Sequence, residues 1–146
     1  MTAIFLEYDT YALLAQSRIK ALKQMAQESE LLRARYCLHR SHNDGVQEMV
    51  IALLKGSQVP VHRHAGKSES YHMIEGLIEV LFYDNQGNRT DVIKLGPQDS
   101  GLPFIYRLAP GVWHTVRVLS ECAVIHETTT GPFRENDREI LELKNE

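Results

Sequence analysis

The sequence predicts a small all-β domain, an antiparallel sandwich or barrel, with one α-helix in front of it. Two observations lead to this prediction. Near the N-terminus, apolar residues recur every three or four positions, which is the period of an amphipathic helix. From about residue 35 onward, short segments rich in Val, Ile, Leu and Tyr alternate with turn sequences, and no helical pattern separates them. Such a run of strands is typical of an antiparallel sandwich or barrel rather than of a sheet with crossover helices.

The expected helix begins at Asp9 and Thr10, because both side chains can cap a helix N-terminus. Charged residues such as Arg18 and Lys23 lie between the apolar positions and define a polar face. We expect the apolar stripe to pack on the rest of the domain. The stripe consists of Tyr11, Leu14, Ala15, Ile19, Leu22, Met25 and Ala26.

The expected strands are short and are separated by Gly, Pro, Asn and Asp, the residues that favour turns. A jelly roll, an up-and-down barrel and an immunoglobulin-like sandwich are all compatible with this pattern. The strands are expected at residues 36–39, 47–54, 59–64, 70–75, 77–83, 91–95, 104–108, 113–119 and 123–129.

The chain divides into three expected segments. Residues 1–34 form the helical segment, residues 35–130 form the barrel, and residues 131–146 form a heavily charged tail. Ile140, Leu141 and Leu143 could anchor a short helix in this tail, which we expect to lie on the surface or wrap around it.

Composition and charge restrict the function. The 146 residues suffice for one core, and the net charge of −3 disfavours nucleic acids and anionic membranes as partners. No apolar run approaches the roughly 20 residues that cross a bilayer, and the N-terminus carries Glu7 and Asp9 instead of a basic leader. We therefore expect a single cytoplasmic domain. Its two cysteines, Cys37 and Cys122, are expected as reduced thiols.

The histidines form the most informative pattern in the chain. His62 and His64 face the same way on one strand, and a turn at residues 65–68 returns the chain so that Glu69 reaches the same face. His114 follows a tight Pro-Gly turn near the start of a later strand and is the expected fourth ligand. Three imidazoles and one carboxylate suit one divalent transition metal (Fe, Zn, Mn, Ni or Co) and leave positions open for water or substrate.

These residues resemble a known family. The first cupin motif, G-x5-H-x-H-x4-E-x6-G, matches at every specified position, and Gly111 and His114 match the core of the second motif, P-x-G-x-x-H-x3-N. Pro110 directly precedes Gly111 without the usual spacer, and Val118 stands where Asn is usual. The residues of the first motif are Gly56, His62, His64, Glu69 and Gly76.

The resemblance extends to the WbuC-type cupin metalloproteins, which are associated with bacterial O-antigen gene clusters. Residues 35–47 are similar to the segment before the barrel in that family, and residues 112–115 and 131–133, together with Glu127, are similar to its closing segments. The resemblance covers most of residues 15–133. It implies a cupin double-stranded β-helix, a jelly-roll barrel in which the three histidines and Glu69 hold one metal near the centre.

Four further residues are candidates for a substrate pocket. Tyr71 and Met73 alternate with Glu69 on the same strand face, so both should line the cavity beside the metal. Arg107 is a candidate anion clamp, and the alternative is a solvated charge at a sheet edge. His39 lies in the segment that resembles the WbuC-type proteins and is the fourth candidate.

Two other histidines are interpreted differently. His72 is three residues after Glu69 and should lie on the opposite face of the strand, outside the barrel or at an interface. His126 lies beside Val124 and Ile125 and is interpreted as a structural histidine with satisfied hydrogen bonds.

Two classes of function remain open. The first is a metal-dependent enzyme acting on a small, sugar-derived molecule, either an isomerase or epimerase or an Fe-dependent oxygenase. The second is a non-catalytic cupin that binds or senses a ligand. Both take a small-molecule ligand, and the family resemblance adds the expectation of a homodimer. The sequence identifies no catalytic residue.

Overall fold

The computed structural model describes residues 2–143 of the chain. It contains one helix, α1 (Gln16–Glu28), and two 3-10 turns at Gln98–Ser100 and Glu135–Asp137. The remaining elements are strands. They are β1 (Thr2–Phe5), β2 (Arg33–Cys37), β3 (Val46–Leu54), β4 (His62–His64), β5 (Glu69–Glu75), β6 (Ile78–Tyr83), β7 (Arg89–Leu95), β8 (Ile105–Leu108), β9 (Trp113–Val118), β10 (Cys122–Thr130) and β11 (Arg138–Ile140).

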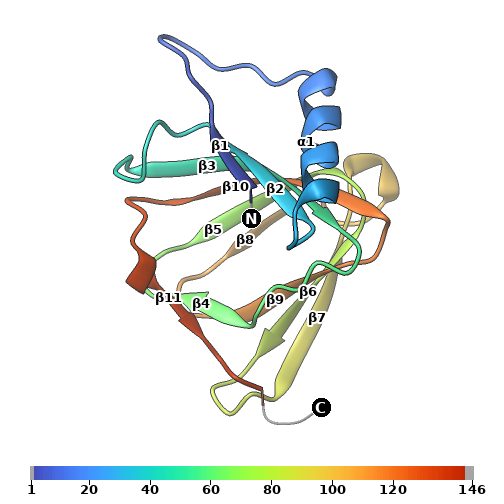
Figure 1. The fold of residues 1–146 in the computed structure, drawn as a ribbon. Coiled ribbons are helices and arrows are strands. Elements are labelled where there is room, and N and C mark those ends of the chain that lie inside the picture. Colours follow the sequence, from blue (N-terminus) through green and yellow to red (C-terminus); the bar gives the residue numbers. More distant parts are fainter. Residues whose placement is uncertain (1, 144–146) are drawn as a thin grey trace.

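The strands form two sheets that face each other, as Figure 1 shows. One sheet has the order β1-β2-β3-β10-β5-β8, and the other has the order β11-β4-β9-β6-β7. All neighbouring strands are antiparallel except β1 and β2, which run parallel. This arrangement confirms the predicted all-β jelly-roll barrel with an N-terminal helix.

The main core lies between the two sheets. Strand alternation turns every second side chain inward, and the inward positions of β6 and β9 carry Val80, Val116 and Val118, which are buried. Ile125 of β10 and Met73 of β5 complete this packing from the opposite sheet. The apolar residues fill one part of the barrel, so the polar inward residues gather in the rest of it.

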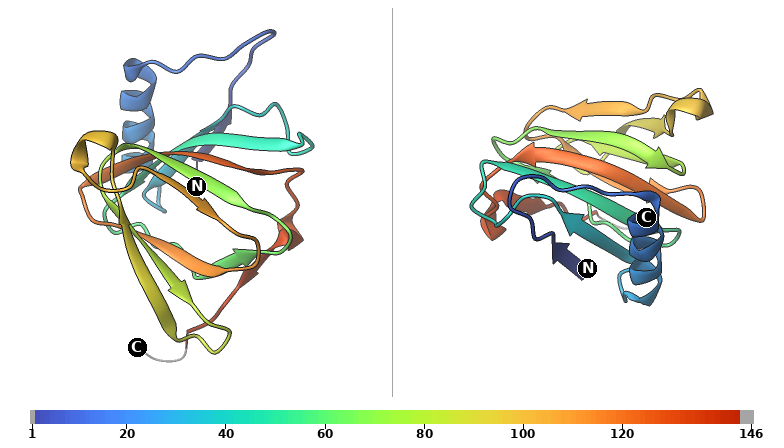
Figure 2. Two further views of the ribbon diagram at one scale, coloured as in Figure 1. Left: turned by 180° about the vertical axis from the view of Figure 1, so that it is seen from behind. Right: turned by 90° about the horizontal axis from the view of Figure 1, so that it is seen from above.

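The helix forms a second core on the outer face of the larger sheet, outside the space between the sheets (Figure 2). Ile19, Leu22 and Ala26 are buried there against residues such as Ala34 and Val124. The apolar stripe thus packs on the domain as predicted. Within residues 2–143, no helix is long and apolar enough to cross a lipid bilayer.

The predicted start of the helix is wrong. The helix begins at Gln16, with Ala15 at the N-cap position and no side-chain cap, and Tyr11 is 67% exposed. The preceding segment is extended because other contacts hold it. Tyr8 donates a hydrogen bond from its hydroxyl to the Leu38 carbonyl (2.6 Å), and Arg40 donates to the Asp9 carbonyl (2.5 Å).

Each expected strand is present, with ends that shift by a few residues, and two strands were not predicted. β1 pairs with β2, and β11 of the tail pairs with β4, so the predicted short helix of the tail is wrong and Ile140 lies in a strand. Residues 144–146 of the predicted tail and Met1 of the helical segment lie outside the described residues. The three-segment division stays a prediction. β2 crosses the boundary at residue 35.

Gly76 of the first motif makes the turn between β5 and β6. Its φ is +77°, a backbone conformation that residues other than glycine rarely adopt. A Cβ at this position would also collide with the Cys122 carbonyl oxygen and the Cα of Ala123. The motif therefore needs glycine here for two reasons, backbone conformation and space.

Replacing Gly76 with Ala should destabilise the fold by about 3 kcal/mol, because conformational strain and a backbone collision add. Gly101→Ala is the matched control. Gly101 has a φ of +79° and nothing within 4 Å of the added Cβ, so this variant should lose only about 1 kcal/mol. Urea unfolding followed by circular dichroism measures both. Equal losses in the two variants would contradict the close approach at Gly76.

Candidate metal centre and ligand cavity

The four predicted ligands come together between the sheets. His62 and His64 lie on β4, His114 lies directly opposite His62 on β9, and Glu69 begins β5 in the facing sheet. The ring centroid of His62 lies 4.4 Å from that of His114 and 5.1 Å from that of His64. Strand alternation and the turn between β4 and β5 thus bring three imidazoles and one carboxylate to one place.

Backbone carbonyls fix the tautomers of two of these histidines. Nδ1 of His62 lies 2.8 Å from the Pro60 carbonyl oxygen, and Nδ1 of His114 lies 2.9 Å from that of Val112. A carbonyl oxygen only accepts hydrogen bonds, so Nδ1 carries the proton in each ring. In the neutral rings Nε2 therefore presents a lone pair, which is the state in which histidine binds a metal.

One contact joins the two sheets at this point. Nε2 of His114 and Oε1 of Glu69 are 2.8 Å apart, and both side chains are buried. Neither atom has a hydrogen bond of acceptable geometry within the described part of the chain. Two lone pairs at this separation repel each other, so the pair needs either a proton on His114 or a cation bound to both atoms.

The pKa values reflect this arrangement. Burial, helped by the nearby His114 and His64, lowers the pKa of His62 to about 4, and burial also lowers the pKa of His64. Burial alone would lower the pKa of His114, but Glu69 outweighs it and raises that pKa. Burial alone would raise the pKa of Glu69, but His114 lowers it. In the absence of a cation these shifts favour a proton on His114 over Glu69 and favour the neutral forms of His62 and His64.

The side chains are not arranged as a finished metal site. Among residues 2–143, no three His, Cys, Asp or Glu side chains could hold a metal ion as they stand. Ligand atoms that share one transition metal lie roughly 3 Å from each other. The contact of His114 with Glu69 meets this spacing, whereas His64 Nε2 lies 3.9 Å from Glu69 Oε2. The donor types and the unpartnered pair suit a metal, and His64 would have to move closer.

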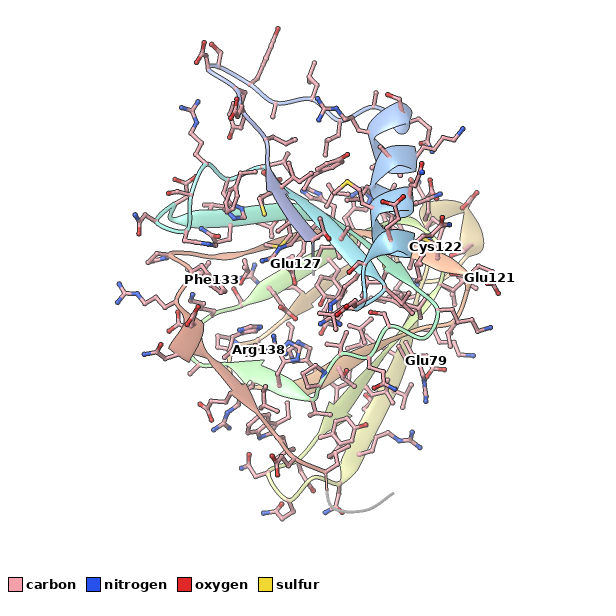
Figure 3. The ribbon with its side chains drawn as sticks, in the orientation of Figure 1. Glu79, Glu121, Cys122, Glu127, Phe133 and Arg138 are labelled. Carbon is pink, nitrogen blue, oxygen red and sulfur yellow. The ribbon has the colours of Figure 1, made fainter. Side chains whose placement is uncertain are left out.

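His62 and His64 border a cavity of about 430 Å³, whereas His114 and Glu69 are not among its lining residues. Apolar residues of the two sheets form part of its wall, including Ile51, Val59 and Val116, and His62 and His64 lie on the wall as well. The C-terminal segment, with Phe133 and Arg138, crosses the open side of the barrel (Figure 3) and contributes to the lining. A cavity of this size, with an apolar wall and a few polar groups, is typical of a small-molecule site.

Glu127 is a site residue that the ligand pattern did not predict. It lies on β10 between Met49 and Tyr71, on the cavity wall, and its carboxyl group hydrogen-bonds to Tyr71 and Glu69. Burial and then the charge of Glu69 raise the pKa of Glu127 to about 8. Alternation with Ile125 places Glu127 inward, but the sequence does not reveal that β10 lies between β3 and β5.

The four pocket candidates take different positions. Tyr71 and His39 line the cavity. Burial raises the pKa of the Tyr71 hydroxyl well above its usual value. Met73 faces inward as predicted but packs in the apolar core and does not border this cavity. Arg107 is exposed, because its partner in register is Ser70, which faces outward like His72. Its guanidinium donates to the Ser68 hydroxyl (3.1 Å).

His72 and His126 lie on the outer face of the larger sheet. His72 is exposed on β5, and its ring centroid lies 6.3 Å from that of His126 on β10. His126 Nε2 contacts Glu48 Oε2 at 2.7 Å. His72 is therefore outside the barrel, and His126 has a partner, as predicted.

The fold and the enclosed polar site define a cupin-fold protein. Protein SO0799 from Shewanella oneidensis has a similar structure (TM-score 0.60, 14% identity, covering 73% of this chain and 72% of that chain). So does oxalate decarboxylase from Bacillus subtilis (TM-score 0.55, 22% identity, 68% of this chain and 24% of that chain). The Cnp3 cupin domain from Schizosaccharomyces pombe also matches (TM-score 0.54, 12% identity, 68% and 64%).

Residues 14–95 match a family model described as a domain of unknown function, DUF6016, and the chain belongs to this family. No curated protein matches the sequence at a significant level. The identities to the solved structures are low, so these structures establish the shared cupin fold and nothing about activity.

A pH-dependent stability follows from the histidines on the cavity wall. Burial lowers the pKa of His39, whose Nδ1 lies 3.0 Å from both the amide nitrogen and the carbonyl oxygen of Glu48. The unfolded chain takes up a proton below pH about 6.5 while the folded protein does not, so stability is full above this pH and falls as the pH drops toward the folded pKa.

His39→Asn should reduce this loss of stability, because Asn can accept the same hydrogen bond without titrating. The difference from the wild type should approach, at most, about 1.4 kcal/mol per pH unit below pH 6.5. Urea unfolding at a series of pH values measures it, with the exposed His72→Asn as the control. The prediction fails if His39→Asn keeps the pH dependence of the wild type.

Proposed function

We propose that this protein is a metal-binding cupin that holds a small molecule in the cavity beside its metal. The observation that carries this proposal is that His114 Nε2 and Glu69 Oε1 lie 2.8 Å apart and that neither atom has a hydrogen-bond partner within residues 2–143. The rings of His62 and His64 lie close to the same place. A divalent transition metal would satisfy both atoms at once. The metal would be Fe, Zn, Mn, Ni or Co, all of which accept this mixture of nitrogen and oxygen ligands.

In this proposal the three histidines and Glu69 hold the ion. When bound, a divalent metal supplies a Lewis acid for a carbonyl or hydroxyl oxygen of the ligand. The backbone carbonyls of Pro60 and Val112 keep two imidazoles oriented with Nε2 inward. Tyr71 and Glu127, hydrogen-bonded to each other on the cavity wall, can donate or accept a proton next to a bound ligand.

The reaction we propose is an isomerisation or epimerisation of a sugar-derived molecule, with Fe-dependent oxygenase chemistry as the second branch. The choice of a sugar and of an O-antigen pathway rests on the resemblance to WbuC-type proteins alone. Incubation with hexose phosphates and sugar nucleotides, followed by product analysis, tests the first branch. Oxygen uptake by the Fe(II)-loaded protein tests the second. A ligand that binds tightly without turnover would favour a sensing role instead.

The metal proposal predicts that His114→Ala and His64→Ala lose metal, by about tenfold or more relative to the wild type, because each removes a ligand. Elemental analysis of untagged protein, purified without a nickel column, measures metal per chain. His72→Ala removes an exposed histidine of the outer face and is the matched control, with unchanged metal content.

Circular dichroism should show that the variants keep the β fold. Metal in equal amounts in all variants, or its absence from the wild type after growth in metal-supplemented medium, would remove the site assignment.

A further inference from the structure

Two arginines of β2 line the cavity, whereas Ala34 and Tyr36 of the same strand are buried in the core under the helix. Arg33 and Arg35 lie on β2 opposite Leu53 and Ile51 of β3, and all four side chains line the cavity. Inward positions of a barrel strand are usually apolar, because a charged group loses hydration there. Two successive inward arginines therefore indicate that a charged or polar group binds at this part of the cavity.

Arg35 has almost no partner inside the protein. Its Nε is buried without a hydrogen bond, and its Nη1 donates to the thioether sulfur of Met49 at 3.6 Å. A thioether is a weak acceptor. Within residues 2–143, no carboxylate lies within ion-pair distance of Arg35, although its charge reaches Glu127.

Arg33 adds a second cation beside it. Its Nη1 donates to the Gln58 carbonyl (2.8 Å) and to the Ser57 hydroxyl (3.5 Å), whereas its Nε is buried without a partner. Burial, and then the charges of Arg138 and Arg35, lower the pKa of Arg33, so three guanidinium groups act on one another at this side of the cavity. Like charges gathered in this way repel each other until an anion lies between them.

Lys67, another cation on the wall, differs from these arginines. It forms an ion pair with Asp137 at 2.7 Å and donates to the Pro132 carbonyl, so its charge is already matched within the protein. Arg35 and Arg33, next to the apolar side chains of Met49 and Ile51, therefore carry positive charge that no carboxylate of residues 2–143 matches, as do Arg134 and Arg138 of the C-terminal segment, which also line the cavity.

We propose that this cavity selects an anionic ligand and binds its carboxylate or phosphate group at Arg35, with Arg33 beside it. A planar guanidinium can bind either group through two parallel hydrogen bonds. Met49, Ile51 and Leu53 contact the body of the ligand next to the anion. This inference names the ligand class of the cavity and rests on the proposed ligand-binding role of the same cavity.

The test uses two pairs of probes whose members differ in charge, benzoate against benzamide and glucose 6-phosphate against glucose. Isothermal titration calorimetry measures each dissociation constant with EDTA-treated protein and again with metal-loaded protein. In at least one pair, the anion should bind about tenfold or more tightly than its neutral partner, because charge-assisted hydrogen bonds are the stronger ones. The pair that shows the preference also tells a carboxylate from a phosphate ester.

Arg35→Met removes the charge at similar side-chain length and should abolish the preference, lowering anion affinity about tenfold while leaving the neutral partner unchanged. Arg35→Lys should keep part of the preference, because it retains charge without the planar fork. Arg107→Met is the matched control, since Arg107 is an exposed arginine on β8 outside the cavity, and it should behave as the wild type.

The inference is overturned if neither anion is preferred by the wild-type protein, a result that needs no variant to fold. It is also overturned if Arg35→Met, folded by circular dichroism, keeps the preference. Anion preference in EDTA-treated protein does not depend on the metal, and metal content is measured separately. Failure of the metal assignment is therefore distinguishable from failure of the anion site.

Discussion

The carboxylate of Glu69 and the imidazole of His114 meet across the barrel, one from each sheet, and neither has a satisfactory hydrogen bond there. Buried polar atoms left in this state destabilise a protein unless something else binds them. The other histidines of the site, His62 and His64, lie beside this contact. β4 adds two imidazoles, backbone carbonyls hold His62 and His114 with their Nε2 lone pairs inward, and the apolar core fills the rest of the barrel.

The cavity wall carries two chemically different groups. His62 and His64 lie on it together with Glu127 and Tyr71, and the arginines of β2, Arg33 and Arg35, lie on it as well. An acidic ligand that binds the arginines would place its remaining atoms among apolar side chains, in the same cavity that the histidines border. The metal proposal and the anion proposal thus concern two groups of residues at the same cavity, and each proposal rests on its own unpartnered atoms.

The sequence predicts the central part of this account well, because strand alternation is a strong constraint. The spacing of His62, His64 and Glu69 determines their common face, and the structure places all of them with His114. Residues whose role depends on which strands are neighbours could not be predicted. Glu127 becomes a site residue because β10 lies between β3 and β5, and Arg35 because β2 extends the sheet beyond β3.

The sequence also could not predict which inward residues of a strand border the cavity and which pack in the apolar core. Tyr71 and Met73 share a face, yet the first borders the cavity and the second lies in the core, because the barrel is filled unevenly along β5. The helix start was wrong because a cap residue favours a helix only when tertiary contacts leave it free, and hydrogen bonds to Leu38 and Asp9 hold this segment extended.

We propose that one cation lies between Glu69 and the three histidines. The most direct measurement is an anomalous difference map from crystals of untagged protein, with data collected on both sides of the absorption edge of the metal found by fluorescence scanning. We expect a single strong peak within bonding distance of Glu69, His114, His62 and His64. Crystals grown with metal that show Glu69 and His114 in direct contact, and no peak beside them, would contradict it.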